Sequence, residues 1–216
     1  IGMSSSNPQI DFSPFLEGGE TGKKQVASQI GKACREIGFF TLTDHWVSLD
    51  LIQRVFDANR EFHQQPLEEK EEILISHSDY HRGYHPFSAE ATDPNAKPDL
   101  KEAFDMALEL SLDDPDVKAG KPFHGPNVWP RNLPQFRKIL EEYYQALLLL
   151  GERICRCFAI DLGLDEDYFV DKHSKPLAQL RLLHYPELDM SCHPDQQGAV
   201  YYTHLRAHET GRNLVC

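Results

Sequence analysis

The sequence has few basic residues and no long apolar run. Its 22 lysines and arginines stand against 34 aspartates and glutamates, which gives a formal net charge of −12. Nucleic acids and anionic membrane surfaces both need a concentrated positive field, so neither is expected as the main partner. The longest apolar stretch, Ala146–Gly151, is much shorter than the roughly 20 residues of a transmembrane helix. We therefore expect no membrane segment, and a small molecule as the substrate.

Cysteines are also few and irregularly spaced. The five are Cys34, Cys155, Cys157, Cys192 and Cys216. An odd number without a CxxC pair predicts neither a disulfide framework nor a zinc knuckle. The N-terminus lacks the basic and apolar regions of a secretory signal, and Met3 is a candidate start residue. These absences predict a cytoplasmic protein.

Apolar residues recur at helical spacing in several parts of this 216-residue chain. We predict helices at residues 21–38, 48–65, 66–74 and 133–164. In the second helix, the residues predicted to face the core are Ile52, Val55, Phe56 and Phe62. No internal repeat is present, so one continuous fold is expected.

Strand-favouring stretches alternate with these helices. We predict strands at residues 10–15, 39–45 and 176–186, because they are short, apolar and bounded by turn residues. Residues 76–125 break into loops and short strands, in which "KEAFDMALEL" is the ordered part. Loops of this kind are where contacts to ligands are most often made.

In this order, the stretches resemble one family, the isopenicillin N synthase-like branch of the Fe(II)- and 2-oxoglutarate-dependent oxygenases. The matching words are "IDFSPF", "ACREIGFFTLTDH", "FHQQPLEEK", "RGYHPF", "DLKEAFDMALEL", "GPNVWP", "LPQFRKILEEYYQALLLLGERICRCFAIDLGL" and "LRLLHYP". The resemblance implies an α+β fold, with a helical N-terminal region on a distorted double-stranded β-helix (jelly roll) that is incomplete in this chain. It implies an N-terminal oxygenase region at 7–115, the long core-backing helix and first part of the jelly roll at 116–199, and a non-family tail at 200–216.

The same resemblance implies an oxidoreductase with Fe(II) and 2-oxoglutarate as cofactors and ascorbate as an optional one. Such a dioxygenase uses dioxygen to oxidise a small-molecule substrate, and it releases succinate and CO2. Two alternatives stay open: a 2-oxoglutarate-independent, isopenicillin N synthase-like oxidase, and a non-catalytic truncated remnant that only binds a partner. The substrate and the oligomeric state are not determined by the sequence.

Two residues are carried over as site residues. Tyr185, in "LHYP", matches a family tyrosine that reaches 2-oxoglutarate or the substrate, and we predict that it binds the cofactor. Arg82, in "HRGYH", matches a loop position that faces the substrate, where a guanidinium suits a carboxylate. His45 is interpreted as structural, Trp46 stands where the family usually has glycine, and Leu183 replaces an asparagine of many plant members.

No iron ligand and no catalytic residue is assigned. The family's His-x-Asp motif follows a glycine-rich approach, which "QQGA" matches here. The histidine expected after it falls near Tyr202 and the expected acidic residue near His204, so neither ligand is present there. His193 with Asp195 has the spacing but precedes that approach, and His204 with His208 would share one face of a helix. We therefore expect the chain alone to be inactive and to aggregate, because an incomplete jelly roll exposes strand edges.

The histidines of "HSDYHRGYH" are spaced by four residues, as zinc ligands on a helix would be. These are His77, His81 and His85. Gly83 and Pro86 disfavour a helix there, so a zinc site at these residues is not our prediction.

Overall fold

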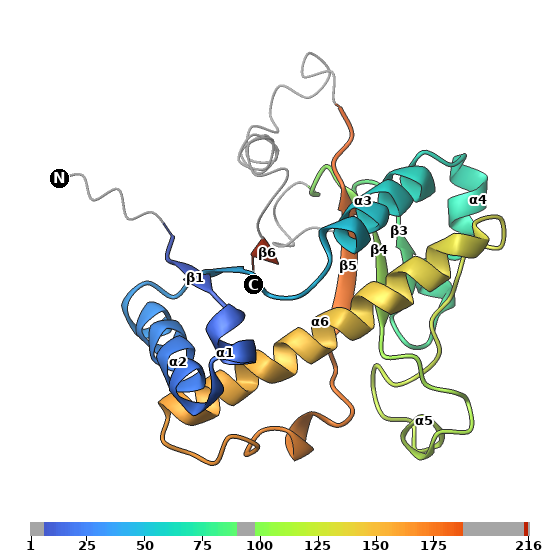
Figure 1. Cartoon of the computed structure of the whole chain (residues 1–216). Coiled ribbons are helices and arrows are strands. Elements are labelled where there is room, and N and C mark those ends of the chain that lie inside the picture. The colour runs from blue at the N-terminus through green and yellow to red at the C-terminus, as the bar shows by residue number, and fades with distance from the viewer. Residues whose placement is uncertain (1–6, 90–97, 188–213, 216) are drawn as a thin grey trace. The chain divides into compact units, whose positions relative to one another are not determined.

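The computed structural model describes residues 7–89, 98–187 and 214–215, and it contains helices together with short strands (Figure 1). The predicted α+β class is therefore confirmed. No helix in the described ranges has the length and apolar character required to cross a bilayer.

The chain divides into two compact units. Among the described residues, the first unit contains 7–48, 145–175 and the last strand, β6 (Leu214–Val215). The second contains 49–89, 98–144 and 176–187. The long helix α6 (Pro134–Asp161) contributes residues to both units. The domain ranges given by the family resemblance stay a prediction.

The first unit contains a small three-stranded sheet. β1 (Gln9–Asp11) runs parallel to β2 (Thr41–Thr43), and β6 pairs with β2 on its other side in the antiparallel direction. The strand predicted at 10–15 ends earlier than expected, because helix α1 (Ser13–Glu17) begins there. Proline suits a first helical turn, and Pro14 lies in it, so the apolar run changes from strand to helix within three residues.

Helix α2 (Gly19–Glu36) confirms the helix predicted at 21–38. It buries Val26 and Ile30 completely, four residues apart on one face. The helix ends where Gly38 adopts a φ of +88°, and the Gly38 N–H donates to the carbonyl of Ala33 at 3.0 Å. This left-handed conformation is the usual reason for a glycine after a helix.

The segment after β2 explains a departure from the family pattern. His45 is buried, and its Nδ1 accepts the Val47 N–H at 3.2 Å, as expected for a structural histidine. Trp46 has a φ of +74°, a conformation that glycine adopts without strain and that tryptophan does not. The guanidinium of Arg153 lies 4.8 Å from the centre of the exposed Trp46 ring, and this cation–π contact offsets part of the strain.

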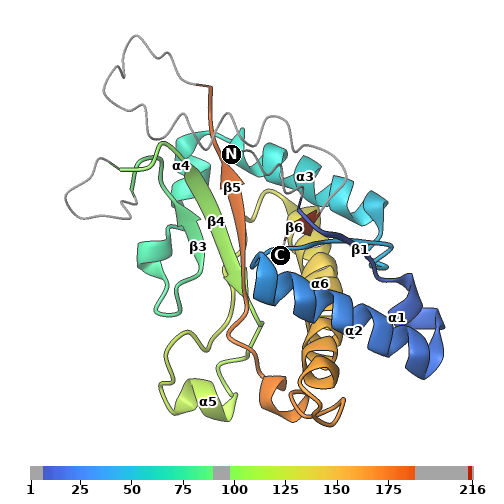
Figure 2. The same cartoon turned by 90° about the vertical axis from the view of Figure 1, so that its left-hand side faces the viewer.

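The second unit is built around an antiparallel sheet in the order β3–β4–β5, seen as adjacent arrows in Figure 2. The strands are β3 (Gly83–His85), β4 (Glu102–Ala107) and β5 (Gln179–His184). Register places Tyr84 opposite Phe104 and Phe104 opposite Leu182. Every residue of the central strand β4 is buried. This strand lies within "KEAFDMALEL", the part of residues 76–125 that the sequence predicts to be ordered.

Helices pack against one face of this sheet. They are α3 (Leu49–His63), α4 (Leu67–Glu71) and the first part of α6; the short helices η1 (Ile75–His77) and α5 (Pro115–Lys118) lie in the connections. One prediction for α3 is wrong, because Phe56 is 59% exposed. Leu51, Val55, Ala58 and Phe62 form the buried face, and Phe56 lies one residue outside that pattern.

An aromatic cluster fills the space between the helices and the sheet. The ring of Phe62 lies 5.3 Å from Phe104, 5.0 Å from Phe136 and 6.0 Å from Tyr84, measured between centroids. Trp129 lies 5.9 Å from Phe104 on the same face. Burial of each such aromatic side chain contributes about 2 kcal/mol to stability by area. Because the rings come from both the helices and the sheet, the cluster holds the helices against this face of the sheet.

Candidate functional site

Strand β4 carries two carboxylates that a folded protein rarely buries. Glu102 is 6% exposed and Asp105 is 1% exposed. Side chains alternate along a strand, so two residues three apart point to opposite faces of the sheet. Glu102 shares the face of Phe104 and the aromatic cluster, and Asp105 lies on the other face. We therefore describe them as the Glu102 network and the Asp105 network.

The Glu102 network joins β4 to four other elements of the second unit. The Lys70 ammonium on α4 donates to Oε2 at 2.7 Å, and the Tyr84 hydroxyl on β3 donates to the same oxygen. His184, the last residue of β5, donates from Nδ1 to Oε1 at 2.8 Å. Lys70 also donates to the carbonyl of His63, at the end of α3, at 3.1 Å. Lys70 itself is 6% exposed, so this is a buried ion pair.

These donors determine the charge of Glu102. Burial alone would raise its pKa, but the hydrogen bonds from His184, Lys70 and Tyr84 lower the pKa to about 2. The Tyr84 pKa is raised by burial and by donation to Glu102, so the phenol stays protonated. At neutral pH the network therefore holds a fixed carboxylate–ammonium pair.

His63 borders this network as a neutral, buried imidazole. Burial lowers its pKa to about 4. Its Nδ1 donates to the carbonyl of Asn59 at 2.9 Å, and its ring lies 5.2 Å from the ring of His184. The Nε2 atom is buried and has no hydrogen-bond partner in the described part of the chain. Asn59 also donates from its side chain to the carbonyl of Leu183 at 3.1 Å, which ties α3 to β5.

The Asp105 network lies on the opposite face of the sheet. Arg181 on β5 donates to Oδ1 from Nε and to Oδ2 from a terminal nitrogen, both at 2.7 Å, which is a bidentate pair. His85 on β3 donates from Nε2 to Oδ2 at 2.8 Å. Gln179 donates to Oδ2 at 2.7 Å. Residues of all three strands therefore meet at one buried carboxylate.

The Asp105 network holds the Arg181 guanidinium in a fixed orientation. Burial alone would raise the Asp105 pKa, but donation from His85 and Arg181 lowers it, so the carboxylate stays charged. The Arg181 side chain is 33% exposed, whereas Asp105 is almost completely enclosed. The carboxylate fixes the plane of the guanidinium, which is the condition for directional recognition of a polar group.

The structure places Arg82 beside loop backbone. It is 3% exposed, and its guanidinium donates to the carbonyls of Tyr80 at 2.6 Å, His81 at 3.2 Å and Phe123 at 2.8 Å. Its Nε is buried without a hydrogen-bond partner among the described residues, and burial lowers its pKa. His81 and Phe123 both have a positive φ, so Arg82 stabilises a strained junction of two loops. Its contact with the substrate stays a prediction.

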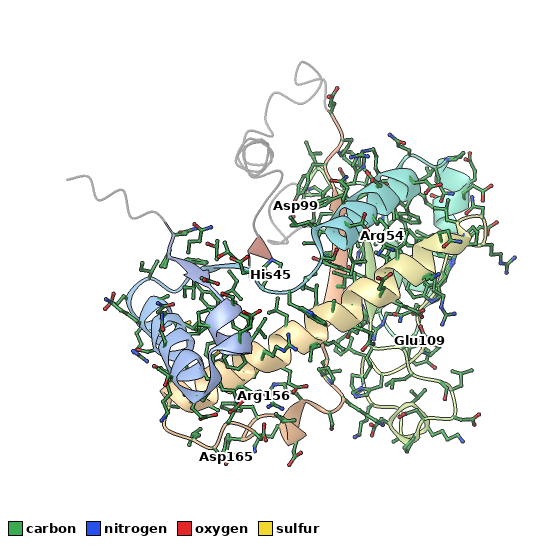
Figure 3. All side chains as sticks on the ribbon, viewed as in Figure 1. His45, Arg54, Asp99, Glu109, Arg156 and Asp165 are labelled. Atoms are coloured by element: carbon green, nitrogen blue, oxygen red, sulfur yellow. The ribbon has the colours of Figure 1, made fainter. Side chains whose placement is uncertain are left out.

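Exposed charges on the helices do not extend these networks. Arg54 of α3, labelled in Figure 3, donates to both carboxylate oxygens of Glu142 on α6 at 3.1 Å. Such exposed pairs contribute little to stability. The two buried networks are therefore the candidate site of this unit.

The remaining predicted site residues lie at or beyond the described end of β5. Tyr185 follows β5 directly and is partly buried. His193, Asp195, His204 and His208 lie outside the described residues. Within the described ranges, no three or more histidine, cysteine, aspartate or glutamate side chains form a group that could hold a metal ion. His77, His81 and His85 lie in η1, a loop and β3 rather than on one helix.

Glu102, Asp105, Arg181 and His184 were not identified from the sequence. A signal was present, because "KEAFD" and "LRLLH" place charged or titratable residues inside apolar strands. Polar residues at buried strand positions need partners from neighbouring strands. The sequence alone does not say which strand is the neighbour, so the networks could not be assembled from it.

Comparisons with known proteins give a family for this chain. The family model described as "non-haem dioxygenase in morphine synthesis N-terminal" matches residues 8–132, more than half of the chain. A "2-oxoglutarate-Fe(II) type oxidoreductase" of Aspergillus fumigatus is 34% identical over 182 residues, 83% of this chain and 54% of the relative. A "2-oxoglutarate-dependent dioxygenase" of Didymella fabae is 35% identical over 185 residues, 83% of this chain and 56% of the relative. The chain thus spans about half the length of these curated relatives.

Solved structures agree with that match. A full-length Neurospora crassa protein in complex with alpha-KG has a TM-score of 0.72 at 28% identity, covering 92% of this chain and 60% of that one. A putative 2OG-Fe(II) oxygenase family protein from Caulobacter crescentus has a TM-score of 0.71 at 27% identity, covering 86% of this chain and 58% of that one.

Proposed function

Because the chain belongs to the family of 2-oxoglutarate- and Fe(II)-dependent dioxygenases, we propose that it is part of an oxidoreductase acting on a small molecule. In this proposal, dioxygen and 2-oxoglutarate are consumed, the substrate is oxidised, and succinate and CO2 are released. The observation that carries the proposal is the family match over residues 8–132, to which the structural matches add support. The net negative charge favours a small-molecule partner. A cytoplasmic location stays a prediction.

The sheet of the second unit is interpreted as the first part of a jelly roll. β3, β4 and β5 are antiparallel, and the helices and aromatic cluster cover the Glu102 face. The Asp105 face carries polar residues and small ones such as Ala103. In a double-stranded β-helix one sheet face lines the interior, and we assign that role to the Asp105 face.

Cofactor and substrate are proposed to meet at this Asp105 face. Strand alternation places Arg181 and Leu183 on it, and continuing the alternation by one residue adds Tyr185. Tyr185 is proposed to bind 2-oxoglutarate through its hydroxyl group. Arg181, oriented by Asp105, is proposed to recognise a polar or anionic group of the substrate. Arg82 is kept as a proposed substrate residue, and its Nε has no hydrogen-bond partner among the described residues.

Iron is implied by the family, and it would activate dioxygen. The described residues do not fit it, because they form no group of three or more metal-ligand side chains. No ligand is therefore assigned, and no step is derived through the metal. The roles proposed for this chain are to bind and orient the organic reactants and to keep water from the Asp105 face.

The full-length product of the source gene tests this proposal. Purified protein is supplied with Fe(II), 2-oxoglutarate and candidate small molecules, and succinate and dioxygen uptake are both measured. Succinate that requires iron and 2-oxoglutarate supports the proposal. Oxygen uptake without succinate would instead show an isopenicillin N synthase-like oxidase. Absence of both, with iron not retained, would count against the proposal and favour a non-catalytic binding protein.

Tyr185→Phe examines the cofactor contact within the same assay. Loss of one hydroxyl hydrogen bond is expected to raise the KM for 2-oxoglutarate by about tenfold, because a charge-assisted hydrogen bond contributes about 1.5 kcal/mol or more. Tyr168→Phe is a matched control, since Tyr168 is 46% exposed and lies in the other unit. An unchanged KM in Tyr185→Phe would remove Tyr185 from the cofactor site.

A further inference from the structure

We propose that Glu102 is a positioning residue: through His184 it fixes the end of β5 and thereby the place of Tyr185, on which affinity for 2-oxoglutarate depends. This inference rests on the proposed function, in which Tyr185 binds the cofactor. Glu102 itself lies on the opposite face from Asp105, so it touches neither reactant. Its influence passes along the strand.

The contact between Glu102 and His184 is located where a strand is least constrained. The two residues are directly opposite each other in the β4–β5 register, and His184 is the last residue of β5. Strand ends fray because the last residue of a strand is followed by residues that make no ladder hydrogen bonds. A hydrogen bond of 2.8 Å from His184 to a buried carboxylate opposes this fraying.

Glu102 can hold His184 because its own position is overdetermined. Lys70 and Tyr84 approach the other carboxylate oxygen from α4 and β3, and both donors are buried. The carboxylate therefore cannot rotate away without leaving a buried ammonium unpaired, which is costly. His184 is additionally packed against the ring of His63, 5.2 Å away.

Tyr185 is the next residue, so it inherits this constraint. Adjacent residues of an extended strand are roughly 3.3 Å apart and point to opposite faces. Holding the His184 side chain on the helix-covered face therefore directs Tyr185 to the Asp105 face. The hydrogen bond from Asn59 to the Leu183 carbonyl holds the backbone just before His184. It does not determine the direction of the Tyr185 side chain.

Two variants and one control separate positioning from general stability. His184→Leu removes the imidazole from Glu102, and Glu102→Gln keeps the volume but changes the acceptor for His184. Leu140→Ala is the control: Leu140 is fully buried on α6 and forms no part of the network, yet its truncation destabilises the same unit. All three are compared with the unchanged protein.

The first readout needs no activity and, like the second, uses the full-length gene product. Tyrosines are replaced by 3-fluorotyrosine, the Tyr185 signal is assigned with Tyr185→Phe, and its 19F NMR spectrum is recorded. We expect a shifted or broadened Tyr185 signal in His184→Leu and Glu102→Gln, and the unchanged signal in Leu140→Ala. Identical Tyr185 signals in all of these proteins would overturn the proposal.

The second readout uses the full-length gene product. His184→Leu and Glu102→Gln are expected to raise the KM for 2-oxoglutarate roughly tenfold with a smaller change in kcat, since displaced binding groups lose affinity and orientation. Leu140→Ala should lower thermal stability and leave that KM unchanged. Turnover with an unchanged KM in both network variants would overturn the positioning role. Absence of turnover in the unchanged protein would instead count against the proposed function, and the 19F result would still decide whether Glu102 holds Tyr185.

Discussion

Replacing Lys70 by Met tests whether the Glu102 network is held by its charge pair. The side chains of Lys70 and Glu102 are 8% and 7% exposed, so solvent cannot replace the lost ammonium. Removing one partner of a buried ion pair typically costs about 3–5 kcal/mol of unfolding free energy. Lys70→Met also leaves the His63 carbonyl without this donor, although that loss is included in such measurements. We therefore expect a loss of about 3–5 kcal/mol near pH 7.

The Glu102 charge pair also predicts how the free energy of unfolding changes with pH, which a loss of packing alone would not. The folded-state pKa of Glu102 is about 2, against an ordinary value of 4.5. A depressed carboxylate pKa stabilises the fold above the ordinary value, and this contribution is lost as pH falls from 4.5 through about 2. The full difference corresponds to about 3 kcal/mol. Without Lys70 the folded-state pKa moves up toward 4.5, so acid should destabilise the variant by less than it destabilises the unchanged protein.

Urea unfolding followed by circular dichroism at pH 7 and pH 3 measures both effects. Lys118→Met is the control, because Lys118 is 61% exposed and pairs with Asp113, which is 92% exposed. We expect the control to stay within about 0.5 kcal/mol of the unchanged protein. A cost below about 1 kcal/mol for Lys70→Met, with an unchanged acid response, would refute the reasoning.

Three further substitutions test neighbouring parts of the site by urea unfolding. In the unchanged protein, His63 should lower the free energy of unfolding by about 2 kcal/mol between pH 7 and pH 5, because the buried histidine, with a pKa of about 4, stays neutral while the unfolded chain takes up a proton. His63→Leu should abolish this decrease, and the same pH dependence in the variant would contradict the assignment. Arg82→Met should cost about 2–4 kcal/mol, because three loop carbonyls lose their donor, and a cost near zero would exclude the loop-stabilising role. Asp105→Asn should cost about 2 kcal/mol and, in the full-length gene product, raise the KM for substrate but not for 2-oxoglutarate; the reverse pattern would place the substrate elsewhere.

Much of the secondary structure could be predicted from local pattern. The helix predicted at 133–164 is observed as α6, and the strand predicted at 176–186 contains β5, because long amphipathic or apolar patterns leave few alternatives. The errors occurred where one residue changes the outcome. The strand at 10–15 gives way to α1 at Pro14, and Phe56 is exposed although its type favours burial.

The candidate site could be predicted only in part. Tyr185 and Arg82 were proposed because they match family positions, and neither role follows from residue type. The contact partners of Arg82 are three carbonyls, and backbone groups have no signature in the sequence. The sequence does not predict Glu102 and Asp105 as site residues, because an acidic residue in a strand normally faces solvent and only its neighbours in the fold show that it is buried.

The sequence by itself determined the family, the class of the fold and the order of its elements, because these depend on patterns within short segments and on their succession. Tertiary structure decided which face of β4 each carboxylate occupies and which partners it meets. Lys70, Tyr84 and His184 lie far apart along the chain, and they converge on Glu102 only after α4, β3 and β5 have packed. The charge of that glutamate, and hence its pKa of about 2, is a property of the packed network, because burial and hydrogen bonding act only at the distances that folding creates.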